Sequence, residues 1–248
     1  MTADRPPIEA VDLEWAAGRL TPPRARPRGV ARAVARFEAR LADLVFSDAT
    51  LEGNPFTLPE VRTLLDGLGV DGHTLLETRQ VLSLAASSRF VADTARRGPS
   101  LPSRDTSDTV NRLVTEHEVI EPGVLRGTGT VTGGGAVNAM GHRFQAPQDP
   151  VRLASCFDEG ARRAAGPGHP VANAAMWAAW ATYYQFYFDG NKRTSRHTMN
   201  LALMSQGFDA IMVREADRRA YNQALADLFA TGDPTPYAQL LVNRYEDS

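Results

Sequence analysis

The sequence contains a single cysteine, Cys156, so no disulfide can form within the chain. Proteins without disulfides are typical of reducing compartments, and we expect this one to be cytoplasmic. Long apolar runs are also absent, because no stretch reaches the roughly 20 residues that cross a bilayer. Residues 1–7 lack the apolar segment of a signal peptide. The sequence therefore predicts a protein without a membrane partner.

An excess of charge of one sign is missing as well. Lys and Arg together number 27 and Asp and Glu 29, which leaves a formal net charge of -2. DNA-binding surfaces rely on basic side chains that neutralise phosphates, and the overall balance supplies no such excess, so we expect no DNA partner. Hydrophobic residues make up 43% of the 248 residues, which is ordinary for a globular protein with a large core.

Helical patterns dominate the rest of the chain. Residues 1–29 are expected to form an N-terminal extension or loop, because Pro and Arg crowd between residues 20 and 29. Residues 30–248 form the expected main domain, where apolar residues recur at spacings of three and four. We expect helices over residues 30–52, 57–65, 73–95, 151–165, 171–184, 191–206, 214–230 and 236–244, with a loop over 96–107. The fold class is all-α.

Two segments depart from the amphipathic pattern. Residues 171–184 are apolar on every side, which predicts a helix buried at the centre of the domain. Residues 122–148 contain many glycines, which exclude a stable helix and predict a mobile hairpin or loop. This segment is the one good candidate for β-strands.

The buried segment leads into a tight turn with a basic helix start. Asp189-Gly190-Asn191 is a turn signal, and the helix after it presents unpaired N–H groups and the positive end of the helix dipole, which attract anions. Lys192, Arg193 and Arg196 follow within the first turns. Cations at this end oppose the dipole, so three of them favour a bound anion over an ordinary basic helix start.

Asp189 adds a metal ligand to this anion site. Its carboxylate lies just ahead of the turn, and Mg²⁺ is commonly held by one or two carboxylates together with the phosphates of a substrate. The turn and the helix start therefore predict a site for a polyphosphate with a divalent metal.

The segment from Gln185 to Arg196 resembles the signature of the Fic family (Fic/Doc, or Fido fold), which reads His-x-Phe-x-Asp/Glu-Gly-Asn-Gly/Lys-Arg-x-x-Arg. The resemblance extends over about residues 30–244 and implies a helical bundle with a short β-hairpin flap near residues 128–144. A protein or small hydroxyl-bearing target would dock at that flap by strand addition. The positions that match the signature are Asp189, Gly190, Asn191, Lys192, Arg193 and Arg196.

The resemblance also implies the chemistry of the signature loop. Most members transfer AMP from ATP to a protein hydroxyl, some transfer other phosphate-bearing groups, and Doc-type members are kinases. Asp189 would coordinate Mg²⁺, Arg193 would contact the triphosphate and Arg196 the terminal phosphate. The nucleotide-binding set implied in this way is Gly190, Asn191, Lys192, Arg193 and Arg196, with Arg193 and the residue at position 185 as the catalytic pair.

One departure from the signature affects catalysis. Gln185 stands where the family has its general base, and glutamine cannot accept and hold a proton near neutral pH. Tyr187 replaces the family's phenylalanine, which is a milder change. His197 is a poor substitute, since it points about 100° away from Arg196 on the helix. His142, on the flap, stays open as a substitute.

A second motif lies upstream, at the end of the helix expected near residues 30–53. Leu51-Glu52-Gly53-Asn54 resembles the inhibitory motif Ser/Thr-x-x-x-Glu-Gly/Asn of autoinhibited Fic proteins. The resemblance implies that Glu52 pairs with Arg196 and blocks the terminal phosphate. The match is partial, because Asp48 occupies the Ser/Thr position. An ordinary helix end is the alternative.

Three functions therefore remain open at the level of the sequence. The first is a nucleotidyltransferase with weakened or altered catalysis, and the second is a Doc-like kinase. The third is an inactive nucleotide-binding regulatory protein. Glu52 favours an enzyme, because a brake serves only where there is activity to restrain, whereas Gln185 favours the inactive protein. All three predict ATP or another nucleotide with Mg²⁺ as ligands, and the sequence allows a homodimer.

Overall fold

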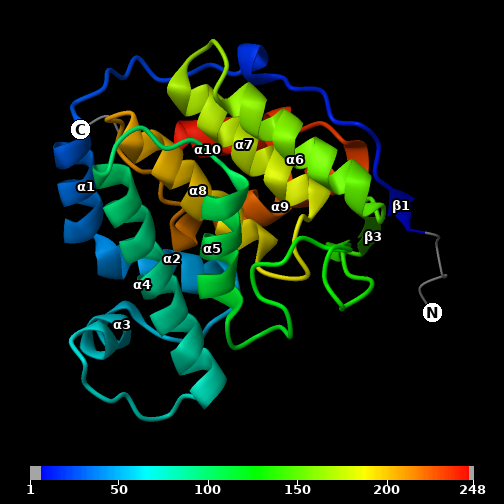
Figure 1. Cartoon of the computed structure of the whole chain (residues 1–248). Helices are drawn as coiled ribbons and strands as arrows, with labels where there is room; N and C mark the ends of the chain where they lie inside the picture. Colours follow the sequence, from blue (N-terminus) through cyan, green and yellow to red (C-terminus); the bar gives the residue numbers. More distant parts are fainter. Residues whose placement is uncertain (1–6, 246–248) are drawn as a thin grey trace.

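The computed structural model describes residues 7–245, so the first six residues of the expected extension and the last three of the expected domain lie outside the described part. The predicted helical fold with a short β-hairpin is confirmed (Figure 1). The α-helices are α1 Val30–Ala39, α2 Leu41–Leu51, α3 Leu58–Leu65, α4 Leu75–Arg96, α5 Arg104–Thr115, α6 Pro150–Ala164, α7 Pro170–Tyr184, α8 Asn191–Ser205, α9 Arg218–Thr231 and α10 Thr235–Asn243.

Helices α7 and α8 form the centre of the molecule. Every residue of α7 from position 171 to 184 is buried, as its apolar sequence predicts. Helix α8 packs along α7, while α6 and α10 cover α7 and α4 and α5 cover α8 (Figure 1). Because both central helices are enclosed, the loop between them is held rigidly from two sides. None of the helices in the described residues has the length and apolar character needed to span a membrane.

The helix boundaries differ from prediction in three places. The helix expected from residue 214 begins at Arg218, after a short 3-10 helix at Glu215–Asp217. The single helix expected over residues 30–52 is two helices, because the chain leaves helical geometry at Arg40, where φ is -111°. The loop predicted over residues 96–107 ends earlier than expected, because α5 begins at Arg104. Ser103 caps that helix by accepting a hydrogen bond from the Thr106 amide, an arrangement in which Thr replaces the usual Glu or Gln of a capping box.

A three-stranded sheet lies beside the helices. Strands β2 Ala136–Ala139 and β3 His142–Gln145 form an antiparallel hairpin, and β1 Ile8–Glu9 pairs in parallel with β3. Met140 and Gly141 both have positive φ, as tight two-residue hairpin turns require. In the order β1-β3-β2, β1 closes one edge of the hairpin and leaves β2 as an edge strand.

Residues 7–29 belong to the same folded body as the main domain. They cross the molecule from β1 to the start of α1 (Figure 1). Leu13 and Leu20 are buried in the main core. The amides of Val11 and Leu13 donate to the hydroxyls of Tyr183 and Tyr184, at 3.0 and 3.1 Å. A proline-rich composition excludes helix, but it does not prevent a chain from packing its apolar residues.

Candidate functional site

The loop between α7 and α8 is closed by one side chain, that of Asn191. Its Oδ1 accepts a hydrogen bond from the Tyr187 amide at 2.8 Å. Its Nδ2 donates to the Tyr187 carbonyl at 2.8 Å and to Oε1 of Gln185 at 3.0 Å. The side-chain amide of Asn191 is therefore used within the loop, which it shapes. It is not free for the phosphate contact that the resemblance implies.

Gly190 permits the sharp entry into α8. Its φ is 72°, and a Cβ built there would lie 2.3 Å from Cγ2 of Thr115 on α5. Nδ2 of Asn111, also on α5, donates to the Asp189 carbonyl at 2.9 Å. The turn is thus pressed against α5, and only a residue without a side chain fits at position 190.

We expect Gly190→Ala to destabilise the fold by about 2 kcal/mol, because it combines a left-handed backbone with a clash. Urea unfolding would measure the free energy of unfolding. Gly133→Ala is the matched control: it also has positive φ, but its Cβ would meet nothing within 4 Å. Equal losses in the two variants would show that backbone conformation alone, and not contact with α5, sets the cost.

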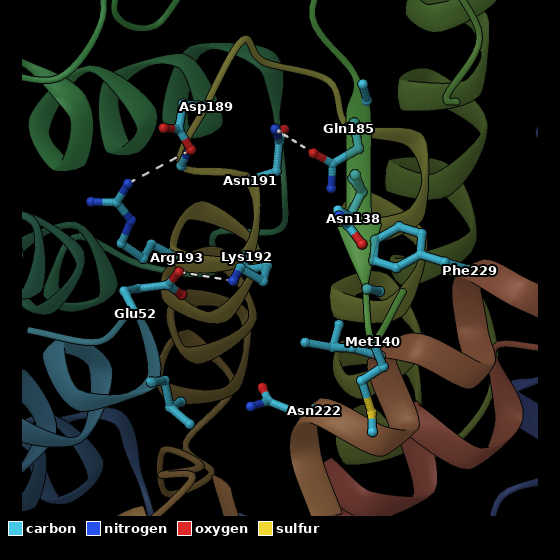
Figure 2. Close-up of a pocket in the computed structure, with 16 residues that line it drawn as sticks. Glu52, Asn138, Met140, Gln185, Asp189, Asn191, Lys192, Arg193, Asn222 and Phe229 are labelled. Carbon is cyan, nitrogen blue, oxygen red and sulfur yellow. Dashed lines mark hydrogen bonds and ion pairs between the residues drawn. The ribbon is translucent and has the colours of Figure 1, made fainter. Parts of the chain in front are cut away.

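A cleft of about 460 Å³ opens at the start of α8 (Figure 2). A volume of this order suits a small-molecule ligand. Figure 2 shows Glu52, Asp189, Lys192 and Arg193 on one side, with Gln185 beside Asn138 of the flap and Phe229 of α9 on the other. The residues lining it are Leu51, Glu52, Ala136, Val137, Asn138, Ala139, Met140, Gln185, Asp189, Gly190, Asn191, Lys192, Arg193, Asn222, Leu225 and Phe229.

The structure brings the three predicted cations together at the start of α8, and each one faces a carboxylate. Nζ of Lys192 lies 2.9 Å from Glu52. Both Nη atoms of Arg193 bond Glu118, and Nη1 also donates to the Val114 carbonyl at 3.1 Å. The side chain of Lys192 is 38% exposed and that of Arg193 only 5%. Lys192 and the backbone N–H groups of the helix start are therefore the groups most accessible to an incoming anion.

Arg196 lies deeper than the other two cations. Its Nε donates to Asp48 at 2.6 Å, its Nη1 to the Tyr221 hydroxyl at 2.7 Å and its Nη2 to Glu52 at 3.3 Å. Only 3% of its side chain is exposed, and it does not line the cleft. The implied contact with a terminal phosphate would therefore require these side chains to move.

Glu52 and Arg196 do lie together, as the upstream motif implies. The carboxylate of Glu52 forms ion pairs with two cations: Oε1 faces Arg196 and Oε2 faces Lys192. Burial raises the pKa of Glu52, but the nearby charges of Lys192, Arg196 and Arg193 outweigh it and hold the pKa below its usual range. Glu52 is therefore a charged group at the edge of the cleft. Its inhibitory role stays a prediction.

Two acidic residues of this network, Asp48 and Glu118, are not among the site residues predicted from the sequence. Asp48 bonds both Arg196 and Nε2 of His197, the latter at 2.9 Å. Its position four residues before Glu52 places both on one face of α2, so spacing could have indicated it. Glu118 follows α5 in the chain, far from the signature, and no sequence signal links it to Arg193.

Gln185 is held within the loop. Its Nε2 donates to the Thr182 carbonyl at 2.6 Å, and its Oε1 accepts from Asn191. Among the described residues that line the cleft, the ionisable ones are Glu52, Asp189, Lys192 and Arg193. His197 bonds Asp48 and Ser87 away from the cleft, as expected for a poor substitute. His142 begins β3, but the structure does not describe its side chain.

Asp189, the predicted metal ligand, lines the cleft, and its Oδ1 lies 3.9 Å from Nη2 of Arg193. Its side chain is 62% exposed, and its Oδ1 accepts from the Gly190 amide at 2.5 Å. The described residues contain no group of three or more His, Cys, Asp or Glu arranged for a metal ion. This donor set fits Mg²⁺, which keeps water ligands and takes one or two carboxylates with substrate phosphates, and does not fit a metal enclosed by protein ligands.

Comparison with known proteins points to one family. No family model matches the sequence. The chain is 27% identical over 203 residues to the protein adenylyltransferase Fic of Culex quinquefasciatus, covering 80% of this chain and 39% of that protein. It is 28% identical over 185 residues to the protein of the same name from Nematostella vectensis, covering 73% and 42%. The chain thus spans about two fifths of the length of these relatives.

Solved structures agree in fold. The chain is similar to Fic-1 (residues 134–508) from C. elegans, with a TM-score of 0.68, 20% identity, and coverage of 90% of this chain and 63% of that one. It is also similar to a Fic domain containing signaling protein from Bacteroides thetaiotaomicron, with a TM-score of 0.69, 20% identity, and coverage of 87% and 82%. Both likenesses cover most of the described helices.

Proposed function

Since the chain is a Fic-family protein, we propose that it binds ATP with Mg²⁺ in the cleft at the start of α8 and transfers AMP slowly to a hydroxyl. The observation that carries the proposal is the cleft itself, where the N-terminus of α8, Lys192 and the exposed carboxylate of Asp189 face one space of nucleotide size. The curated relatives are named protein adenylyltransferases, which supports AMP as the transferred group.

Different groups of the protein would hold the phosphates, the metal and the nucleoside. The backbone N–H groups of the helix start and Lys192 would hold the phosphates. Asp189 would hold Mg²⁺, which when bound neutralises phosphate charge. Arg193 is fixed by Glu118 with little freedom, so it would contribute its charge to the phosphate site more than a new contact. The apolar face of the cleft, from Leu225 and Phe229, is suited to the nucleoside.

The flap would present the target. Strand β2 lines the cleft and is one of the two edge strands of the sheet, since β3 lies between β1 and β2. An extended segment added to this edge would be held by main-chain hydrogen bonds, next to the site of the nucleotide. A hydroxyl-bearing residue in that segment could then approach the α-phosphate.

The absence of a histidine at position 185 limits the rate. In the transfer, the hydroxyl oxygen bonds to the α-phosphorus, the bond to the β-phosphate oxygen breaks and pyrophosphate leaves. The hydroxyl proton passes to solvent, because Gln185 cannot hold it. Losing a positioned base costs about 10²- to 10⁴-fold, while positioning and electrostatics are kept. Slow transfer is the expected outcome.

An inactive nucleotide-binding protein is the second candidate, and the bonds of Gln185 favour it. Its amide is engaged with Thr182 and Asn191, so it completes the loop and is not poised toward a substrate. Incubation with Mg²⁺ and ATP labelled at the α- or the γ-phosphate separates the candidates. Label from the α-phosphate on protein supports AMP transfer, and label from the γ-phosphate indicates a kinase. Measurable ATP binding without either label supports the inactive protein.

We expect Glu52→Gly to raise ATP affinity or automodification about tenfold, because it releases Lys192 and removes a carboxylate from the edge of the cleft. Titration with MgATP and the α-label assay would measure both quantities. Glu116→Gly is the control, since it removes an exposed glutamate at the end of α5. Unchanged binding and automodification in Glu52→Gly would remove Glu52 from the inhibitory role.

A further inference from the structure

Arg196 has a second acidic partner, Asp48, which differs from Glu52 in its place on α2. Asp48 lies inside the last full turn of the helix, whereas Glu52 is its C-cap residue and precedes Gly53, whose φ is 84°. The end of a helix frays more easily than its interior. Glu52 can therefore swing away by a local change, but Asp48 moves only if α2 moves.

The contacts of Asp48 hold it in place more firmly than those of Glu52. One carboxylate oxygen accepts from Nε of Arg196 at 2.6 Å, and the other lies 2.9 Å from Nε2 of His197. His197 is fixed in turn by Ser87 of α4, whose Oγ lies 2.8 Å from Nδ1. Burial raises the pKa of Asp48, but Arg196 and His197 outweigh it and bring the pKa to about 2. Asp48 is thus negatively charged at neutral pH, beside Arg196.

This arrangement changes which phosphates the site can neutralise. When Glu52 swings away, Lys192 is released, because Glu52 is its partner. Arg196 is not released, since Asp48 and Tyr221 still hold it behind the cleft wall. A diphosphate would be held by the helix N-terminus and Lys192. The family resemblance assigns Arg196 to the additional phosphate of a triphosphate, and this arginine is already paired with the carboxylate of Asp48.

We propose that Asp48 is a specificity-determining residue, which makes the cleft prefer a nucleoside diphosphate to the triphosphate whether or not Glu52 is in place. The inference rests on the proposed nucleotide site and adds a constraint to it. Glu52 sets how open the site is, and Asp48 sets how many phosphates the open site accepts. Slow use of ATP then has two causes, the missing base at Gln185 and the occupied Arg196.

Calorimetric titration of the full chain with MgADP and with MgATP tests the proposal. Wild type is expected to bind MgADP about tenfold more tightly than MgATP. Glu52→Gln is expected to tighten both nucleotides and keep their ratio. Asp48→Asn, which keeps the shape and removes the charge, is expected to shift the ratio about tenfold toward MgATP. Asp43→Asn is the control, because it removes a carboxylate from the same helix whose partner is Arg62.

Several outcomes would overturn the inference. Equal binding of the two nucleotides by wild type would do so, as would an unchanged ratio in an Asp48→Asn protein that melts cooperatively. If Asp48→Asn does not fold, the Glu52→Gln titration decides, since loss of the diphosphate preference there would assign it to Glu52. Binding of neither nucleotide by wild type and Glu52→Gln would overturn the proposed function as well, whereas equal binding of both overturns this inference alone.

Discussion

Gln185→His is expected to raise AMP transfer by about 10²- to 10⁴-fold, the range that a positioned general base contributes. The backbone at position 185 should accept the change. Gln185 has φ 48° and ψ 59°, a left-handed conformation in which histidine is several-fold enriched among non-glycine residues. Its carbonyl accepts a hydrogen bond from Nε of Arg126 at 2.6 Å, which fixes the main chain independently of the side chain.

The assay should separate chemistry from binding. Transfer of the α-label would be followed at saturating MgATP in a Glu52→Gln background, so that the pairing of Glu52 with Lys192 does not limit binding. Gln185→Ala is the matched control, because it removes the amide without adding a base. Transfer by Gln185→His should also fall as pH drops below about 6.5, where an ordinary imidazole becomes protonated.

A rate for Gln185→His no higher than that of Gln185→Ala, at equal MgATP affinity, would contradict the expectation. The missing base at position 185 would then not be what limits the rate of AMP transfer. The flap or the phosphate site would instead have diverged from an active arrangement. A high rate without the fall at low pH would exclude imidazole as the base. The first of these results would favour the inactive nucleotide-binding protein.

Much of the site follows from local sequence signals. Asp189-Gly190-Asn191 predicts a turn, and the structure shows why, since Gly190 has positive φ and Asn191 bonds the backbone of Tyr187. The buried helix before it is equally local, because its apolar residues surround the whole helix axis. These features depend on contacts between neighbours in the chain, which periodicity and turn chemistry describe directly.

The remainder of the site depends on contacts between distant segments. Glu118 meets Arg193 across 75 positions, and Asp48 meets Arg196 across 148. The Glu118 pair has no signal in composition or spacing, because any of the 29 acidic residues could in principle face that arginine. Asp48 is indicated only by its spacing of four residues from Glu52. The start of α5 was missed for a different reason, since Thr106 stands where a capping box usually has Glu or Gln.

Arg126 is a further residue that the sequence alone does not single out, and it joins the flap to the signature loop. Its Nε donates to the Gln185 carbonyl, and its Nη2 donates to the carbonyls of Pro147 and Tyr184, at 3.0 and 3.3 Å. Gly135 passes directly over it, because a Cβ there would lie 2.5 Å from the guanidinium carbon. Burial lowers the pKa of Arg126 to about 10, which leaves it charged at neutral pH.

We expect Arg126→Met to destabilise the protein by about 3 kcal/mol, because three buried carbonyls lose a charged donor while the apolar volume is largely kept. Urea unfolding would measure the loss. Arg152→Met is the matched control, since its pair with Asp12 is exposed and should cost less than about 1 kcal/mol. Nucleotide affinity should fall only in Arg126→Met, because the end of α7 would no longer be tied to the base of the flap. Equal losses of stability in the two variants would show that the carbonyls find other donors, and that Arg126 does not organise the site.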